Sequence, residues 1–290
     1  MDAFLSWQVD LLHWIETLRH PVLDQLFLLL TRLGEEEIVI IFLAWLYWNW
    51  NKLMTVKATY AFSLVLLLNI GLKDLFDVPR PFDYDPTLTT AHEIYHEEVE
   101  AGLGYAFPSG HATIGAGWMT AVASLLQKRW IWIVAGVGMT LVALSRLYLG
   151  VHYPLDVVIG VGLGISVVIY GQHLYQRVAN QYLLLGLPLL IIVPFGFFGL
   201  GEDFFKAYGL YIGFAVGLLL ERRYDWLQPA KNKAMKWVRF LLGIVLVLAF
   251  QQGLKLVFPE GDLFLATVRY FFVGLMLYGG APAVFKVLKI

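Results

Sequence analysis

Residues 129–156 read RWIWIVAGVGMTLVALSRLYLGVHYPLD, and this stretch decides the fold class. A mostly apolar run covers 130–147 and a second begins at 154, each near the length of about 20 residues that crosses the hydrocarbon core of a bilayer. Similar runs recur along a chain that is 59% hydrophobic and 15% charged, with a mean hydropathy of +0.68. These values exclude an ordinary soluble domain. The sequence therefore predicts an all-α, polytopic membrane helix bundle.

About nine transmembrane helices are predicted from runs of this kind. They lie at residues 36–51, 54–74, 110–127, 130–147, 154–174, 182–201, 204–221, 237–258 and 263–285. The first of them is short for a crossing. We divide the chain into an N-terminal helical segment (1–34), a core of five spans (35–175) and a four-span C-terminal membrane extension (176–290).

The N-terminal segment is predicted to contain two helices that do not cross the membrane. A helix over residues 4–19 carries a face made of Trp7, Leu11, Leu12, Trp14, Ile15 and Leu18. Such a pattern is typical of a helix that lies in the membrane interface, although an extra helix packed on the bundle fits it equally well. Residues 22–33 are apolar but too short to cross, which predicts a surface or re-entrant helix that ends at Gly34.

The distribution of basic residues predicts the orientation. Most of the 21 Lys and Arg residues fall in loops on one side of the predicted spans, and that side is cytoplasmic by the positive-inside rule. The C-terminus then lies inside, and the N-terminus outside. We expect a plasma membrane, such as a bacterial inner membrane. No basic residue precedes Arg19, so the start lacks the positive region of a cleavable signal peptide.

Three polar clusters fall at the outer ends of the core spans, and together they suggest one site. They comprise Lys73 and Arg80 in KDLFDVPRP, Ser109, Gly110 and His111 in PSGH, and Arg146, His152 and Asp156 in SRLYLGVHYPLD. Each element alone has an ordinary explanation, such as an interfacial lysine, a helix N-cap or an acid in a first helical turn. Their joint occurrence at one membrane depth is harder to explain in this way.

This set of residues suits phosphate chemistry. Three cations, a hydroxyl and a glycine at a helix N-terminus form a phosphate-binding site. Asp156 follows His152 by four residues, so its carboxylate can orient one imidazole nitrogen and leave the other as a nucleophile toward phosphorus. His111 is then placed to protonate the leaving oxygen. The cations already neutralise phosphoryl charge, so we predict neither a metal nor another cofactor.

The motifs K-x6-RP, PSGH and SR-x5-H-x3-D resemble the signature of the type 2 phosphatidic acid phosphatase superfamily at every signature position. The resemblance implies a metal-independent phosphatase that works through a phosphohistidine intermediate. It makes His152 the nucleophile, Asp156 its orienting acid and His111 the general acid. The remaining positions, which the resemblance assigns to phosphate binding, are Lys73, Arg80, Ser109, Gly110 and Arg146.

Looser similarities concern the substrate. LGEEE before the first span and the late VRYFFVGL and GAPAVF look like the sphingosine-1-phosphate phosphatase branch and its bacterial relatives. Glucose-6-phosphatase is similar in span number, so a sugar phosphate remains an alternative, whereas the related vanadium haloperoxidases are soluble. We expect a lipid phosphate or pyrophosphate, because the site lies at headgroup level and Gly160 and Gly164 allow close helix packing or a groove. A non-catalytic lipid-phosphate transporter or binding protein is the alternative of another class.

Several further features carry weaker predictions. His92, Glu93, His96, Glu97 and Glu98, in the loop 83–100, are arranged more like a solvated acidic loop than a metal site. Arg269 and Lys255 either reach the interface or pair with acids such as Asp262, or else they hold a second headgroup charge. The absence of cysteine excludes disulfides and thiolate catalysis. A net charge of -1 gives no indication of a nucleic-acid partner, and the oligomeric state is not predicted.

Overall fold

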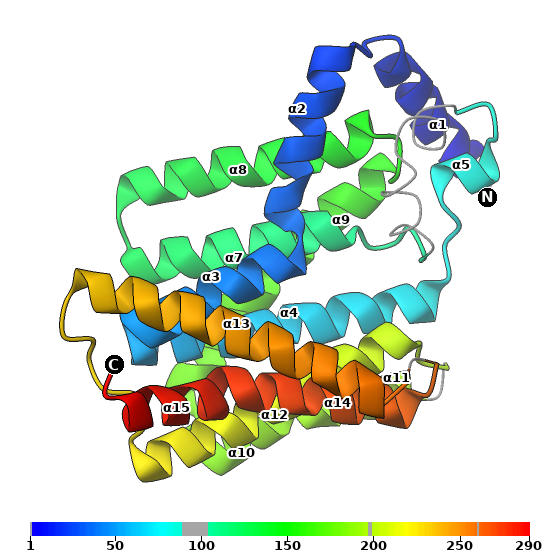
Figure 1. Ribbon diagram of the computed structural model, residues 1–290. Helices are drawn as coiled ribbons and strands as arrows, with labels where there is room; N and C mark the ends of the chain where they lie inside the picture. The colour runs from blue at the N-terminus through cyan, green and yellow to red at the C-terminus, as the bar shows by residue number, and fades with distance from the viewer. Residues whose placement is uncertain (1, 89–103, 197–198, 260) are drawn as a thin grey trace. The chain divides into compact units, whose positions relative to one another are not determined.

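The computed structural model describes residues 2–88, 104–196, 199–259 and 261–290, and every regular element in these ranges is helical (Figure 1). The chain forms two compact units. Unit 1 comprises Met1–Val39 and Leu64–His173, and unit 2 comprises Ile40–Ser63 and Leu174–Ile290. Their boundaries fall inside three helices: α3 (Glu36–Asn49), α4 (Lys52–Phe76) and α9 (Pro154–Arg177).

Six helical segments of the described chain are long and apolar enough to cross a membrane. They are Lys52–Tyr84, Arg129–Tyr148, Pro154–Arg177, Glu202–Tyr224, Lys233–Val257 and Leu263–Leu288. Six such helices support a multi-pass membrane protein, while the count of nine spans stays a prediction. Two of the other three predicted spans coincide with shorter helices, α3 with 14 residues and α7 (Gly110–Leu126) with 17. The predicted span 182–201 is instead a broken series: α10 (Gln181–Gly186), η2 (Leu187–Ile191) and α11 (Ile192–Phe195).

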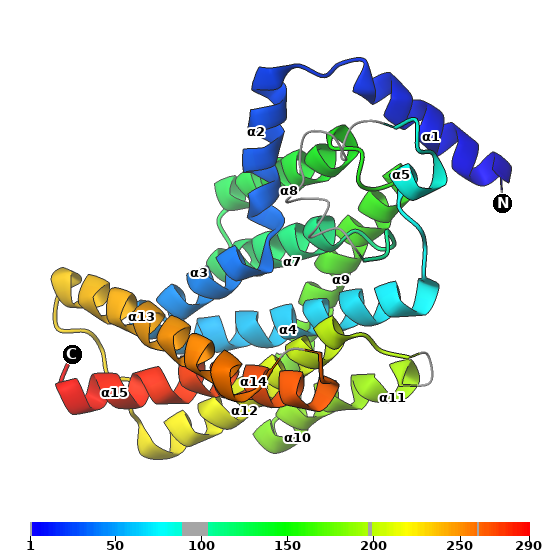
Figure 2. The same cartoon turned by 45° about the vertical axis from the view of Figure 1, so that its right-hand side comes forward.

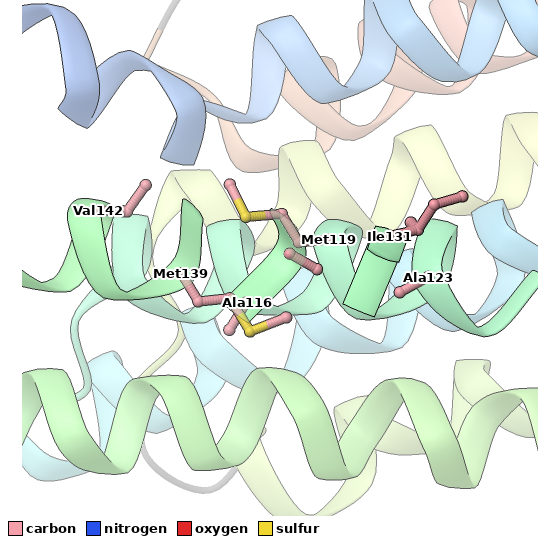
Figure 3. Close-up of a cluster of buried hydrophobic side chains, with 7 residues drawn as sticks. Ala116, Met119, Ala123, Ile131, Met139 and Val142 are labelled. Atoms are coloured by element: carbon pink, nitrogen blue, oxygen red, sulfur yellow. The ribbon is translucent and has the colours of Figure 1, made fainter. Parts of the chain in front are cut away.

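The core of unit 1 lies between α7 and α8 (Arg129–Tyr148), which run side by side in Figures 1 and 2. Met119 and Ala116 of α7 meet Met139 and Val142 of α8, and all four side chains are buried (Figure 3). These apolar residues recur at three- and four-residue spacing, which places them along one stripe of each helix. The two helices therefore form a hairpin, which fixes the start of α7 and the end of α8 relative to each other.

Helix α9 packs on α7 through two glycines. A Cβ atom at Gly164 would lie 2.3 Å from the carbonyl oxygen of Thr113, and one at Gly160 would lie 2.9 Å from the carbonyl oxygen of Ser109. Only a residue without a side chain permits this approach of two helix backbones. The predicted small-residue pair thus serves close packing, and it holds the start of α7 against the second and third turns of α9.

The N-terminal helices belong to unit 1. Helix α1 (Asp2–Glu16) buries Val9 and Leu12 against a cluster that includes Tyr153. Trp7 and Trp14 are exposed on it, so the predicted apolar face is divided between packing and the surface. These contacts agree with a helix packed on the bundle, and the membrane-interface interpretation stays a prediction. Helix α2 (Pro21–Thr31) passes across α8 and continues into the 3-10 turn η1 (Arg32–Gly34), which matches the predicted end at Gly34.

Unit 2 is built around α12 (Glu202–Tyr224) and α14 (Leu263–Leu275). A Cβ atom at Gly213 of α12 would lie 2.0 Å from the carbonyl oxygen of Phe271 in α14, so these backbones are also in direct contact. After α14 the helix widens into one π-helical turn, η3 (Met276–Gly280), and continues as α15 (Ala281–Leu288). Tyr47 and Trp48 of α3 donate hydrogen bonds to the carbonyl oxygens of Tyr278 and Leu277 in this turn. The remaining long helix of the unit is α13 (Lys233–Val257).

Candidate functional site

The segments that carry the three polar clusters meet at one end of unit 1. Lys73 lies in the last turn of α4 and donates from Nζ to the carbonyl oxygen of Tyr105, 2.8 Å away, just before the PSGH segment. Gly110 opens α7, and a Cβ atom there would lie 3.6 Å from Cε of Lys73. The end of α4 and the start of α7 are therefore adjacent, as the phosphate-binding hypothesis requires.

Arg80 links the first cluster to the third. It is the N-cap residue of the short helix α5 (Pro81–Tyr84) and is buried. Its Nε donates to the carbonyl oxygen of Gly104 at 2.8 Å, and its Nη1 donates to that of Val151 at 2.8 Å. The same Nη1 lies 2.9 Å from Nε2 of His152. The guanidinium thus fixes the turn between α8 and α9 and contacts the predicted nucleophile directly.

The geometry around His152 defines its tautomer. An arginine can only donate hydrogen bonds, so Nε2 of His152 accepts from Arg80, and the proton of a neutral ring lies on Nδ1. Nδ1 is 3.5 Å from Oδ2 of Asp156, and that carboxylate oxygen also accepts the backbone N–H of Tyr153 at 2.9 Å. Asp156 is therefore held beside Nδ1 of the ring, while the Nε2 lone pair on the other side faces Arg80.

The charge state of His152 follows from its surroundings. The side chain is almost completely buried in the turn between two predicted spans. Burial is the main factor that lowers the pKa of His152 far below its usual range, and the positive charges of Arg80, Arg146 and Lys73 lower it further. The imidazole is neutral at physiological pH as a result. The same three charges are those predicted to bind phosphate.

The first turn of α7 contributes the second cluster. Ser109 is fully buried, and its backbone N–H donates to the carbonyl oxygen of Asp156 at 3.1 Å. Within the described chain its Oγ atom has no hydrogen-bond partner. His111 follows one residue into the helix, with its backbone against Gly34. The N-terminus of a helix offers free N–H groups to an anion, and here the orphan hydroxyl lies beside them.

Arg146 completes the set from the last turn of α8. It is buried, and its Nη1 donates to Oγ1 of Thr31 at the end of α2. Its charge also lowers the pKa of His152, as do the charges of the other two cations. All eight predicted site residues are therefore gathered in unit 1.

Two supporting residues were not predicted from the sequence. Asn69 lies one turn before Lys73 and donates from Nδ2 to Oγ1 of Thr113 at 3.1 Å. Thr113 in turn donates to the carbonyl oxygen of Ser109 at 2.7 Å, so the pair ties α4 to the first turn of α7. Both side chains are buried polar groups inside apolar runs. That combination is a detectable signal, because a polar residue in a span needs a partner.

The other candidate residues lie elsewhere. Arg269, in unit 2, is 3.8 Å from Oε1 of Glu202 and donates to the carbonyl oxygen of Phe258, while Asp262 accepts the N–H of Leu265 as the cap of α14. The acidic loop with His92 and Glu97 lies outside the described residues. In the part of the chain that the structure covers, no group of three His, Asp or Glu side chains is placed to hold a metal ion.

Comparison with known proteins adds independent information. Residues 53–179 match the PAP2 superfamily, and residues 205–290 match the transmembrane extension of PAP2 superfamily phosphatases. The undecaprenyl-diphosphatase of Sulfolobus acidocaldarius is 31% identical over 165 residues, which cover 55% of this chain and 74% of that protein. Sphingosine-1-phosphate phosphatase 1 of Mus musculus is 30% identical over 161 residues, but these cover only 36% of its length.

A solved structure shares the fold. It is the transmembrane PAP2-type phosphatidylglycerolphosphate phosphatase from Bacillus subtilis, with a TM-score of 0.51 and 23% sequence identity. The similarity covers 62% of this chain and 90% of the other. The family match spans every one of the eight site residues, and the second match explains why the chain continues beyond α9. The chain belongs to the PAP2 superfamily, a family whose members include membrane lipid phosphatases.

Proposed function

We propose that this protein is an integral membrane phosphatase that hydrolyses a lipid phosphate or pyrophosphate through a phosphohistidine at His152, without a metal ion. The main support is the environment of His152: a buried neutral imidazole, oriented by Asp156 and surrounded by the charges of Arg80, Arg146 and Lys73. A nucleophile beside converging cations is suited to attack on a phosphoryl group.

Substrate binding changes the contacts of Arg80. In the structure its Nη1 lies against Nε2 of His152, the atom that attacks phosphorus. In the proposed complex the phosphoryl oxygens accept hydrogen bonds from Arg80, Arg146, Lys73 and the first N–H groups of α7, and Ser109 donates its hydroxyl. Arg80 thereby releases the lone pair of His152 at the moment when a phosphate occupies the site.

Catalysis then takes two steps. Nε2 of His152 forms a bond to phosphorus while the bond from phosphorus to the leaving oxygen breaks, and His111 gives its proton to that oxygen. Asp156 stabilises the positive charge that develops on the imidazole ring. In the second step a water molecule transfers a proton to His111, and its oxygen bonds to phosphorus while the bond from phosphorus to Nε2 of His152 breaks. Inorganic phosphate leaves, and His152 returns to its neutral form.

A lipid substrate fits the position of the site. The site residues lie at or next to the ends of α4, α7, α8 and α9, and this position supports a site at the headgroup level of the predicted spans. The acyl or prenyl chain remains in the bilayer while the phosphate enters. We assign this end to the extracytoplasmic face, because most basic residues are in loops at the opposite ends of the predicted spans.

The test is turnover by the purified protein with a panel of substrates: phosphatidic acid, phosphatidylglycerol phosphate, undecaprenyl pyrophosphate, a sphingoid-base phosphate and glucose 6-phosphate. We expect phosphate release from at least one lipid in excess chelator, and an acid-labile phosphohistidine after rapid quenching. His152→Ala should lower turnover by at least about 10⁴-fold and abolish the trapped intermediate. His173→Ala is the matched control, since His173 is an exposed residue near the other end of α9.

Each alternative has its own outcome. Preference for glucose 6-phosphate would indicate a sugar phosphatase, and phosphate binding without turnover would indicate a binding protein or transporter. Activity that disappears with chelator and returns with magnesium would contradict the metal-independent mechanism. A phosphoenzyme that persists in His152→Ala would contradict the assignment of the nucleophile.

A further inference from the structure

The turn between α2 and α3, residues Thr31–Gly34, reaches the candidate site from outside the matched family region. The family match begins at residue 53, so it assigns nothing to this turn. The turn nevertheless contacts two site residues, Arg146 and His111. These contacts lie within unit 1 and come from two different positions of the turn.

Thr31 holds the guanidinium of Arg146. Its side chain is fully buried at the last residue of α2, and Oγ1 accepts a hydrogen bond from Nη1 of Arg146. A hydroxyl acceptor restricts the orientation of a guanidinium without neutralising its charge, whereas a carboxylate in the same place would do both. Thr31 therefore leaves the positive charge of Arg146 available for a phosphoryl oxygen.

Gly34 fixes the backbone at His111. A Cβ atom at Gly34 would lie 2.6 Å from the carbonyl oxygen of His111 and 2.9 Å from its Cα atom. Any side chain at this position would displace the first turn of α7. The turn is anchored on the same helix by Trp118, whose Nε1 donates to the carbonyl oxygen of Leu33 at 2.7 Å.

We propose that Thr31 is a positioning residue for Arg146, and that the turn Thr31–Gly34 forms a wall of the active site that sets the placement of Arg146 and His111. The proposal rests on the proposed function, because it concerns the same site. It makes the N-terminal helices part of the catalytic unit, since α2 carries Thr31 on one side of the site.

The test is a double-mutant cycle on phosphate release. Thr31→Val keeps the shape of the side chain but removes the acceptor, and we expect it to lower kcat/KM by about 10- to 100-fold through a misplaced Arg146. Thr31→Ser restores the hydroxyl and should recover activity to within about threefold of the natural protein. Thr120→Val is the matched control, because Thr120 is a buried threonine of α7 whose hydroxyl has no hydrogen-bond partner in the described chain.

The second arm of the cycle uses Arg146→Lys, which keeps a charge but not the planar group that Thr31 holds. If Thr31 acts through Arg146, Thr31→Val should cost less than about threefold in this background, because the two effects are not additive. An equal cost in both backgrounds, or no recovery in Thr31→Ser, would overturn the proposal. If Arg146→Lys retained full activity, the result would contradict the proposed phosphate-binding role of Arg146, not the positioning role of Thr31.

A measurement that does not depend on turnover separates a loss of ligand binding from a loss of stability. Orthovanadate, a phosphate analogue, should raise the Tm of the natural protein by mass action on the folded state. In Thr31→Val and Gly34→Ala this increase should shrink or disappear, while Gly136→Ala of α8, where a Cβ would meet nothing within 4 Å, should keep it. A full vanadate shift in both turn variants would contradict the role of the turn in the site.

Discussion

Buried charges occur in both units, but their neighbours differ. In unit 2 the fully buried Glu221 accepts from Nζ of Lys52 at 2.6 Å and from the N–H of Leu227. Arg239 of the same unit donates to three backbone carbonyl oxygens, those of Trp48, Gln228 and Ile290. In unit 1 Arg80, Lys73 and Arg146 also donate hydrogen bonds, to carbonyl oxygens or to the Thr31 hydroxyl, but in addition their charges act together on one histidine.

Under the proposed function, this difference separates charges that only stabilise the fold from charges that also bind a phosphoryl group. Burying a charge is costly unless nearby groups stabilise it. Unit 2 provides a carboxylate for Lys52 and carbonyl oxygens for Arg239, so these groups stabilise the fold. The like charges around His152 repel one another, and in the proposed complex a phosphoryl group would relieve that repulsion. The site is therefore expected to carry activity at some expense of stability.

The largest effect expected from this comparison comes from replacing one buried arginine by alanine in each unit. Arg80→Ala should lower kcat/KM by about 10³-fold, because a phosphate-binding donor is lost. Its Tm should fall less than that of Arg239→Ala, because removing Arg80 also relieves repulsion with Arg146 and Lys73. Arg239→Ala should lower the free energy of unfolding by about 2–5 kcal/mol, since three carbonyl oxygens lose their donor.

Phosphate release and thermal unfolding in detergent measure both consequences. Arg223→Ala, which changes an exposed arginine of α12, serves as the control for unit 2. An Arg239→Ala protein with unchanged Tm and lost activity would remove the distinction between the two units.

The next effect distinguishes the two histidines of the site. His111→Ala should lower turnover of a lipid monophosphate by about 10²-fold, because an alkoxide leaving group needs a proton. The loss with p-nitrophenyl phosphate should be much smaller, since nitrophenolate leaves without help. Asp156→Asn acts through the nucleophile and should slow both substrates alike. Equal losses in His111→Ala, measured by initial rates, would show that the roles of the histidines are reversed.

A third effect concerns the helix contact beneath the site. Gly164→Ala places a Cβ 2.3 Å from a carbonyl oxygen of α7, so α9 and α7 must separate, at a cost of about 1–3 kcal/mol or more in the free energy of unfolding. Gly162→Ala, two residues earlier in the same helix, meets nothing within 4 Å and should be close to neutral. Thermal unfolding of the two variants tests this, and similar Tm values would contradict the observed contact.

The sequence established the family more firmly than the number of crossings, and the roles of the site residues stay predictions. Family membership, inferred from spaced motifs such as PSGH, is confirmed by the family match. Motif spacing is informative because catalytic residues sit at fixed offsets from helix ends. Span prediction depends on composition alone, so it could not show that residues 182–201 would break at a 3-10 segment containing Pro188. Each short helix in this segment is still apolar, and hydropathy does not show whether a helix is continuous.

Contacts between distant segments were beyond sequence reasoning. Nothing near Thr31 indicates that its hydroxyl meets Arg146, which lies far along the chain. Gly34 was predicted as a helix end, a common role for glycine that concealed its contact with His111. The proximity of His152 and Asp156 could be predicted from the sequence, because the two residues are only four positions apart at a helix start. Relations between residues close in the sequence could therefore be predicted, whereas contacts between distant segments could not.

The smallest expected effect concerns the contact between α1 and the segment after α5. Nε2 of His13 lies 3.2 Å from Oδ2 of Asp85, and Nδ1 lies 3.3 Å from Glu16. The hydrogen bond to Asp85 is the main cause that raises the pKa of His13, and Glu16 adds to it against the opposing effect of burial. A raised pKa means that the protonated form is favoured in the folded state. The stabilisation is thus fully present below the unfolded value of about 6.5 and is lost as pH rises through the folded value.

Hydrogen exchange of the α1 amides measures this loss. Between pH 6 and pH 8, after correction for the intrinsic exchange rate, opening of α1 should increase by roughly twofold to fivefold, the range for a partly exposed ion pair. His13→Gln keeps a polar side chain but does not titrate, so its corrected exchange should be the same at both pH values. Asp85 acts in the opposite direction: its pKa is lowered mainly by the Thr87 hydroxyl, so its contribution is lost only in acid. A pH dependence that persists in His13→Gln would show that another group controls the attachment of α1.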